Sequence, residues 1–133
     1  MTEKEIKEAI EYWKKTAEHD HKTMLALFKS KEYSNSLFFG HIVLEKALKG
    51  LYVKHRKEQA PFTHDLSFLN KDLENNLSAK EEKFLDEVNN FNIRARYPDA
   101  KLKFYKECTK NYAEGKLKEI AIIYEKLWKK LEQ

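Results

Sequence analysis

One stretch of the chain decides its fold: Ser36-Leu37-Phe38-Phe39-Gly40-His41-Ile42-Val43-Leu44-Glu45-Lys46-Ala47-Leu48-Lys49-Gly50-Leu51-Tyr52. At 3.6 residues per turn, its apolar residues fall on two faces of a single helix. The first face carries Leu37, His41, Leu44, Leu48, Leu51 and His55, and the second carries Phe39, Gly40, Val43, Ala47 and Gly50. A helix that is apolar on two faces packs against neighbours on both, so the pattern predicts a central helix.

Three polar side chains interrupt the apolar pattern of this central helix. His41 and Glu45 lie one turn apart at the edge of the apolar stripe, and Lys49 follows one turn later. A charge that is taken out of water is costly unless it is paired or neutralised. We therefore expect these side chains to find partners.

The composition favours one domain built from a few long helices. The 133 residues with 41% hydrophobic content fit a single domain, residues 1–133, with one core. Only 3 Gly and 2 Pro are present, so the supply of turns is poor. Lys and Arg number 26 against 22 Asp and Glu, and this balance is typical of solvated helix faces rather than of a nucleic-acid surface.

Cysteine usage and hydropathy bear on the compartment. Cys108 is the only cysteine, which excludes an internal disulfide and favours a reducing cytoplasm. The chain begins Thr2-Glu3-Lys4-Glu5 after Met1, without the apolar core of a signal peptide. No apolar run approaches the roughly 20 residues that cross a bilayer, so we expect a cytoplasmic protein without membrane contact.

Apolar spacing predicts a long helix on each side of an early break. The first helix covers about residues 3–29 and carries Asp20 within its apolar stripe. The break at residues 33–36 offers Ser and Asn side chains as an N-cap for the second helix. The second helix should end near His55.

Two further long helices follow a connecting loop. Ser78-Ala79-Lys80-Glu81 has the spacing of a capping box and starts the third helix. Pro98 should end that helix shortly after Arg96. The final helix begins somewhere between residues 100 and 112. An all-α fold follows: an antiparallel up-and-down four-helix bundle.

The loop after the second helix should contain a short extra helix or turn, capped by Thr63. Within the second helix, Gly40 and Gly50 each cost about 1 kcal/mol relative to Ala. Something therefore approaches that backbone closely, either a crossing helix or a second subunit. Gly40, Val43, Ala47 and Gly50 form a smooth apolar strip, which we interpret as part of a homodimer interface.

Polar residues in unusual places mark where chemistry could occur. No metal site is predicted, because the His41 and Glu45 pair has no copy on another helix. A structural interpretation is a buried network in which Arg94 or Arg96 pairs with the carboxylates of Asp20 and Glu45. The same side chains could instead form one polar cleft that binds a ligand.

Four segments together resemble the HEPN domain family, whose name stands for higher eukaryotes and prokaryotes nucleotide-binding. They are Trp13…Ala17-Glu18-His19-Asp20, the stretch from His41 to Tyr52, Pro61-Phe62-Thr63-His64-Asp65-Leu66-Ser67-Phe68-Leu69, and Arg94-Ala95-Arg96-Tyr97-Pro98-Asp99. The resemblance spans roughly residues 5–131. It implies an up-and-down helical bundle that usually dimerises.

The resemblance also implies a functional division. Many HEPN domains are metal-independent ribonucleases, with an arginine followed four to six residues later by a histidine near the end of the third helix. Arg94 and Arg96 occupy that place, but no histidine follows at residues 98–102. The chain resembles instead the branch encoded beside small nucleotidyltransferases in toxin-antitoxin-like pairs. The resemblance thus implies a subunit that is not catalytic alone and that binds nucleotide or assists or receives the nucleotide transfer of its partner. We expect no cofactor.

Three hypotheses remain open for the candidate polar cleft. Its residues are Asp20, His41, Glu45, Lys46, Lys49, Arg94, Arg96 and Tyr97, with Thr63, His64 and Asp65 as a loop motif. The first hypothesis is a homodimeric subunit that partners a nucleotidyltransferase and binds nucleotide or RNA phosphates through its cations. The second is a helical adaptor whose polar network is only structural. The third is a ribonuclease that uses a displaced histidine, His41 or His64.

Overall fold

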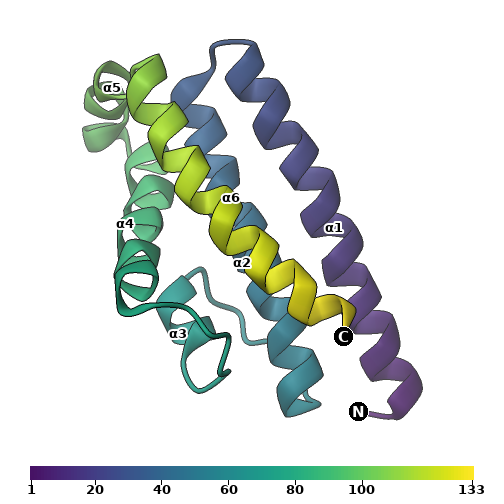
Figure 1. Ribbon diagram of the computed structural model, residues 1–133. Helices are drawn as coiled ribbons and strands as arrows, with labels where there is room; N and C mark the ends of the chain where they lie inside the picture. The colour runs from purple at the N-terminus through teal and green to yellow at the C-terminus, as the bar shows by residue number, and fades with distance from the viewer.

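The computed structural model describes residues 1–133 and contains six helices and no strand. The helices are α1 (Glu3–Lys29), α2 (Tyr33–Arg56), α3 (Leu66–Asn70), α4 (Ala79–Arg96), α5 (Pro98–Glu107) and α6 (Lys110–Glu132). The four long helices, α1, α2, α4 and α6, run alternately up and down, which brings the two termini to the same end (Figure 1). The predicted all-α bundle is confirmed, and the short extra helix after α2 is α3.

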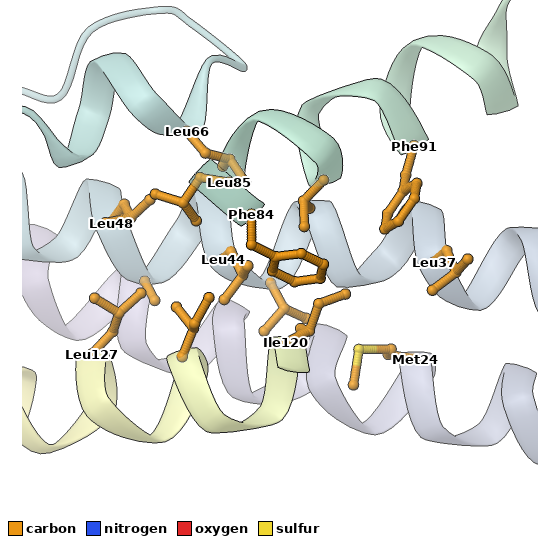
Figure 2. Packing of buried hydrophobic residues seen from close by; sticks show 14 of the residues in the cluster. Met24, Leu37, Leu44, Leu48, Leu66, Phe84, Leu85, Phe91, Ile120 and Leu127 are labelled. Carbon is orange, nitrogen blue, oxygen red and sulfur yellow. The ribbon is translucent and has the colours of Figure 1, made fainter. Parts of the chain in front are cut away.

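Helix α2 lies at the centre, with α1, α4 and α6 packed around it (Figure 1). Leu44 and Leu48 are completely buried. Figure 2 shows them between side chains of α4 above, such as Leu85, and side chains of α6 below, such as Leu127. Burying a leucine side chain contributes about 2 kcal/mol, so the central helix holds its neighbours through such contacts.

Both predicted ends of α4 are confirmed. The Ser78 Oγ accepts from the Glu81 N–H at 3.0 Å, while the Glu81 carboxylate accepts from the Ser78 N–H at 2.9 Å. This reciprocal capping box is the one that the sequence spacing indicates. At the other end the helix stops at Arg96, two residues before Pro98.

The expected cap of α2 is wrong. Its N-cap is Glu32, which makes no side-chain capping bond, and the helix already begins at Tyr33. Ser34 and Ser36 therefore lie inside the first turn and are buried. The hydroxyl of Ser36 donates to the Tyr33 carbonyl at 2.7 Å instead of capping the helix.

Helix α5 was not expected from the sequence. Proline lacks an N–H, which ends a helix but costs nothing at the first position of the next one. Pro98 takes that first position in α5. The last helix begins at Lys110, within the expected range, with the Thr109 hydroxyl accepting from the Tyr112 N–H at 3.2 Å.

The glycine-containing strip of α2 faces other helices of the same chain. A Cβ on Gly40 would lie 2.7 Å from Ile120 Cδ1 of α6. A Cβ on Gly50 would lie 3.0 Å from Leu131 of α6 and 3.2 Å from Trp13 of α1. The interpretation of this strip as a dimer surface is therefore wrong, because crossing helices already cover it.

None of the six helices combines the length and the apolar character that crossing a membrane requires.

Candidate functional site

A polar pocket opens where α2, α4 and the loop before α3 meet. Its volume is about 250 Å³, and it is lined by His41, His64, Asp65, Asn89, Asn92 and Ile93. One lining residue comes from α2, two come from the loop and three come from α4. Residues separated by up to 52 positions in the sequence thus form one small site.

The loop that carries His64 is fixed to α4 through Asp65. This residue, and not Thr63 as expected, is the N-cap of α3, because its Oδ1 accepts from the Ser67 and Phe68 N–H groups. The Thr63 hydroxyl accepts from the Asp65 N–H at 3.1 Å. Asn89 of α4 donates to the Asp65 Oδ1 at 3.0 Å, so the loop is held over α2.

His64 is anchored to the central helix by Glu45. Its Nδ1 donates to Glu45 Oε1 at 2.8 Å, while Lys49 donates to Glu45 Oε2 at 3.1 Å. Glu45 and Lys49 are buried, and the Lys49 Nζ lies 5.4 Å from the centre of the Trp13 ring. The side chain of His64 is 64% exposed. Its Nε2 therefore reaches solvent without a partner in the protein.

A second set of hydrogen bonds connects α4 through α2 to the loop. The Arg96 guanidinium donates to Asn92 Oδ1 at 3.2 Å, and Asn92 Nδ2 donates to His41 Nδ1 at 3.2 Å. His41 Nε2 then donates to the His64 carbonyl at 2.7 Å. Burial lowers the pKa of His41, whose side chain is 0% exposed. His41 is thus neutral and fully bonded.

The remaining predicted residues form separate pairs. Asp20 of α1 pairs with Lys46 of α2. Arg94 pairs with Glu107 of α5 and lies over the Phe104 ring, 4.8 Å from its centre. The expected pairing of the arginines with Asp20 and Glu45 is therefore wrong. The physical reason is α5, an unexpected helix that places a carboxylate beside Arg94.

Arg96 differs from the other candidate cations. Lys46, Lys49 and Arg94 each contact a carboxylate, whereas the side-chain partner of Arg96 is the neutral amide of Asn92. A guanidinium has five N–H donors, so an exposed Arg96 keeps free donors and a full positive charge. Tyr97, the C-cap residue of α4, is exposed beside it.

A larger hollow of about 430 Å³ between α4 and α6 is a weaker candidate. Its lysine Lys116 pairs with Glu87 at 2.6 Å. Lysines and carboxylates alternate along its lining, and it contains no histidine or arginine. Such a surface is typical of solvated helix faces.

Sequence reasoning missed Asn89 and Asn92. The position of Asn92 could have been noticed, because this polar residue lies one turn after Val88 on the buried face of α4. Asp20 is the corresponding case of a polar residue on the buried face of α1. Asn89 gave no comparable signal. Its role depends on where the loop crosses α4, and helical periodicity does not report this. No group of three or more His, Cys, Asp or Glu side chains is arranged to hold a metal ion.

Comparison with known proteins identifies the family of this chain. The HEPN domain model matches residues 10–131, so the chain belongs to the HEPN domain family. The crystal structure of TT1696 from Thermus thermophilus is similar, with a TM-score of 0.77 and 21% sequence identity. The match covers 91% of this chain and 97% of that one, and at this identity it shows a shared fold. The comparison with curated proteins gave no match.

The neutral state of His41 predicts a pH dependence of stability. Because its pKa is lowered in the folded state, the unfolded chain takes up the proton first as the pH falls below about 6.5. The stabilising contribution is complete above that pH and is lost as the pH falls towards the lowered pKa. Urea unfolding of the parent should show a falling free energy of unfolding between about pH 7 and pH 5.

His41→Gln should flatten this slope, and His19→Gln, a change at an exposed position of α1, should leave it unchanged. Some slope should remain in His41→Gln, because burial also lowers the pKa of His21. Equal slopes in the parent and His41→Gln would show that His41 is not held neutral.

Proposed function

We propose that this chain is a HEPN subunit that binds nucleotide phosphates at the pocket between α2 and α4, with Arg96 and His64 as the binding residues. The observation that supports this most directly is that the Arg96 guanidinium is held by a neutral amide, that of Asn92, and not by a carboxylate. Every other cation of the predicted cleft is opposed by a carboxylate, whereas Arg96 retains its charge at the end of a chain that leads to the pocket. Planar guanidinium donors suit phosphate oxygens.

The size of the pocket limits what enters it. A volume of about 250 Å³ suits a phosphate group but not a whole nucleotide. The base would then lie outside, where Ile93 and Tyr97 expose apolar surface one turn apart on α4. His64 contributes when its Nε2 carries a proton and donates to the same phosphate. With one free arginine, affinity should be modest and should weaken with salt.

Titration calorimetry with ADP tests this site. Arg96→Ala should weaken binding about tenfold or more, since a charge-assisted hydrogen bond to phosphate is lost. Its melting temperature should change little, because Arg96 is exposed. The control is Arg56→Ala. Arg56 lies at the far end of α2, with a guanidinium nitrogen 3.8 Å from Asp72 Oδ2. Equal affinities in the two variants would contradict the assignment.

The proposal includes assembly. Family membership and the absence of a histidine after Arg94 and Arg96 support a homodimeric, single-domain subunit that serves a small nucleotidyltransferase in a toxin-antitoxin-like pair. Light scattering of the isolated protein should give about twice 15.9 kDa. A mass of one chain at all concentrations would remove the dimer from the proposal.

A ribonuclease is the second candidate, and the pairing of His64 with Glu45 favours it. Neutral His64 holds its proton on Nδ1 against Glu45 and presents a lone pair at the exposed Nε2, as a general base requires. His41 cannot act in this way, since both its ring nitrogens are bonded and it is buried.

Incubation with single-stranded RNA decides between the candidates. The first proposal expects no cleavage by the isolated protein. Cleavage by the parent that is lost in His64→Gln and retained in His19→Gln would establish the ribonuclease instead.

A further inference from the structure

The chain of hydrogen bonds from Arg96 to the loop has ends that fix its direction. A guanidinium can only donate, and a backbone carbonyl can only accept. Asn92 must therefore turn its oxygen towards Arg96 and its amide nitrogen towards His41. His41 in turn accepts at Nδ1 and carries its proton on Nε2, which donates to the His64 carbonyl.

The donors and acceptors within this series of hydrogen bonds cannot exchange roles. His41 and Asn92 are both buried, and every buried side-chain polar atom has a hydrogen-bond partner. If the Asn92 amide turned over, its NH₂ group would face the guanidinium, donor against donor. Its oxygen would then face the unprotonated Nδ1 of His41, acceptor against acceptor. The unreversed arrangement is thus strongly preferred.

We propose that His41 and Asn92 are positioning residues that act through Arg96: they hold its guanidinium by one inward N–H and leave its other donors facing a bound phosphate. This inference rests on the proposed function of the pocket. Neither residue needs to touch the ligand for it to act. Their shared effect is to fix the orientation of the one candidate cation that no carboxylate opposes.

The choice of an amide at position 92 is what makes this arrangement suitable for an anion. A carboxylate there would hold the guanidinium at least as firmly but would cancel its charge, as Glu107 does for Arg94. Asn92 anchors Arg96 and leaves the charge available. Asn92 therefore fixes the orientation of the Arg96 guanidinium without neutralising its charge, whereas a carboxylate would do both.

Asn92→Asp and Asn90→Asp form a matched pair of variants. Both exchange an amide for a carboxylate of the same shape on α4, and both add one negative charge. Asp at 92 would face Arg96, whereas Asp at 90 would be exposed at the hollow between α4 and α6, away from the proposed site. Calorimetry with ADP and thermal melts are recorded for both variants, for Arg96→Ala and for the parent.

Asn92→Asp should weaken ADP binding about tenfold or more, because its carboxylate pairs with Arg96 and cancels the charge of the guanidinium. Its melting temperature should fall, because the second carboxylate oxygen then faces the unprotonated Nδ1 of buried His41, so binding is titrated well below that temperature. Asn90→Asp should weaken binding by about threefold or less, through screened repulsion alone. Parent-like binding by Asn92→Asp, or equal losses in the two variants, would overturn the inference. If Arg96→Ala binds as the parent does, the proposed function itself fails, and this inference fails with it.

Nitrogen-15 spectra of the parent protein provide a measurement that depends on no variant. At neutral pH, His41 should show the neutral tautomer with its proton on Nε2. A proton on Nδ1, or a doubly protonated ring, would place a donor against the Asn92 amide and would overturn the positioning role.

Discussion

The burial of polar side chains on α2 is the constraint on which the other features of the molecule depend. Three long helices surround α2, so water does not satisfy His41, Glu45 or Lys49. An unpaired polar group in such a place costs about 1–3 kcal/mol, and an unpaired charge costs more. Each of the three side chains therefore recruits a partner, and the partners determine where the loop before α3 and the end of α4 can lie.

The candidate site is formed by the partners of these buried side chains. Glu45 binds His64 through the loop, and His41 binds both the loop and Asn92 of α4. The same contacts that stabilise the bundle thus place His64 in the pocket and link Arg96 to Asn92, which lines it. Structural and ligand-binding roles are not exclusive here, because the buried members of the network satisfy one another and only its two ends, His64 and Arg96, face outward.

Helical periodicity and capping were enough to predict most of the fold. The central position of α2 followed from its two apolar faces, and the start of α4 followed from Ser78 and Glu81. Periodicity failed at Pro98, since a residue that ends one helix can also begin the next. It also could not decide what covers Gly40, because a crossing helix and a second subunit demand the same small residue.

The site was harder to predict than the fold. Buried charges on α1 and α2 indicated that partners exist but did not identify them. Arg94 was expected to pair with Glu45 only because α5, which carries Glu107, was not foreseen. His64 was marked by its resemblance to a family motif, yet its contact with Glu45 depends on the path of a loop with no periodicity. Asn92, a neutral residue, raised no electrostatic question and was overlooked.

The most direct test of the account is to locate a bound phosphate in solution. Backbone and side-chain amide spectra of the isotopically labelled protein would be followed as ADP is added. The account predicts that the largest shifts fall on His64, Asn92 and Arg96, the residues that line or adjoin the pocket between α2 and α4. Shifts centred instead on Lys80, Lys83 and Lys116, in the hollow between α4 and α6, would contradict it.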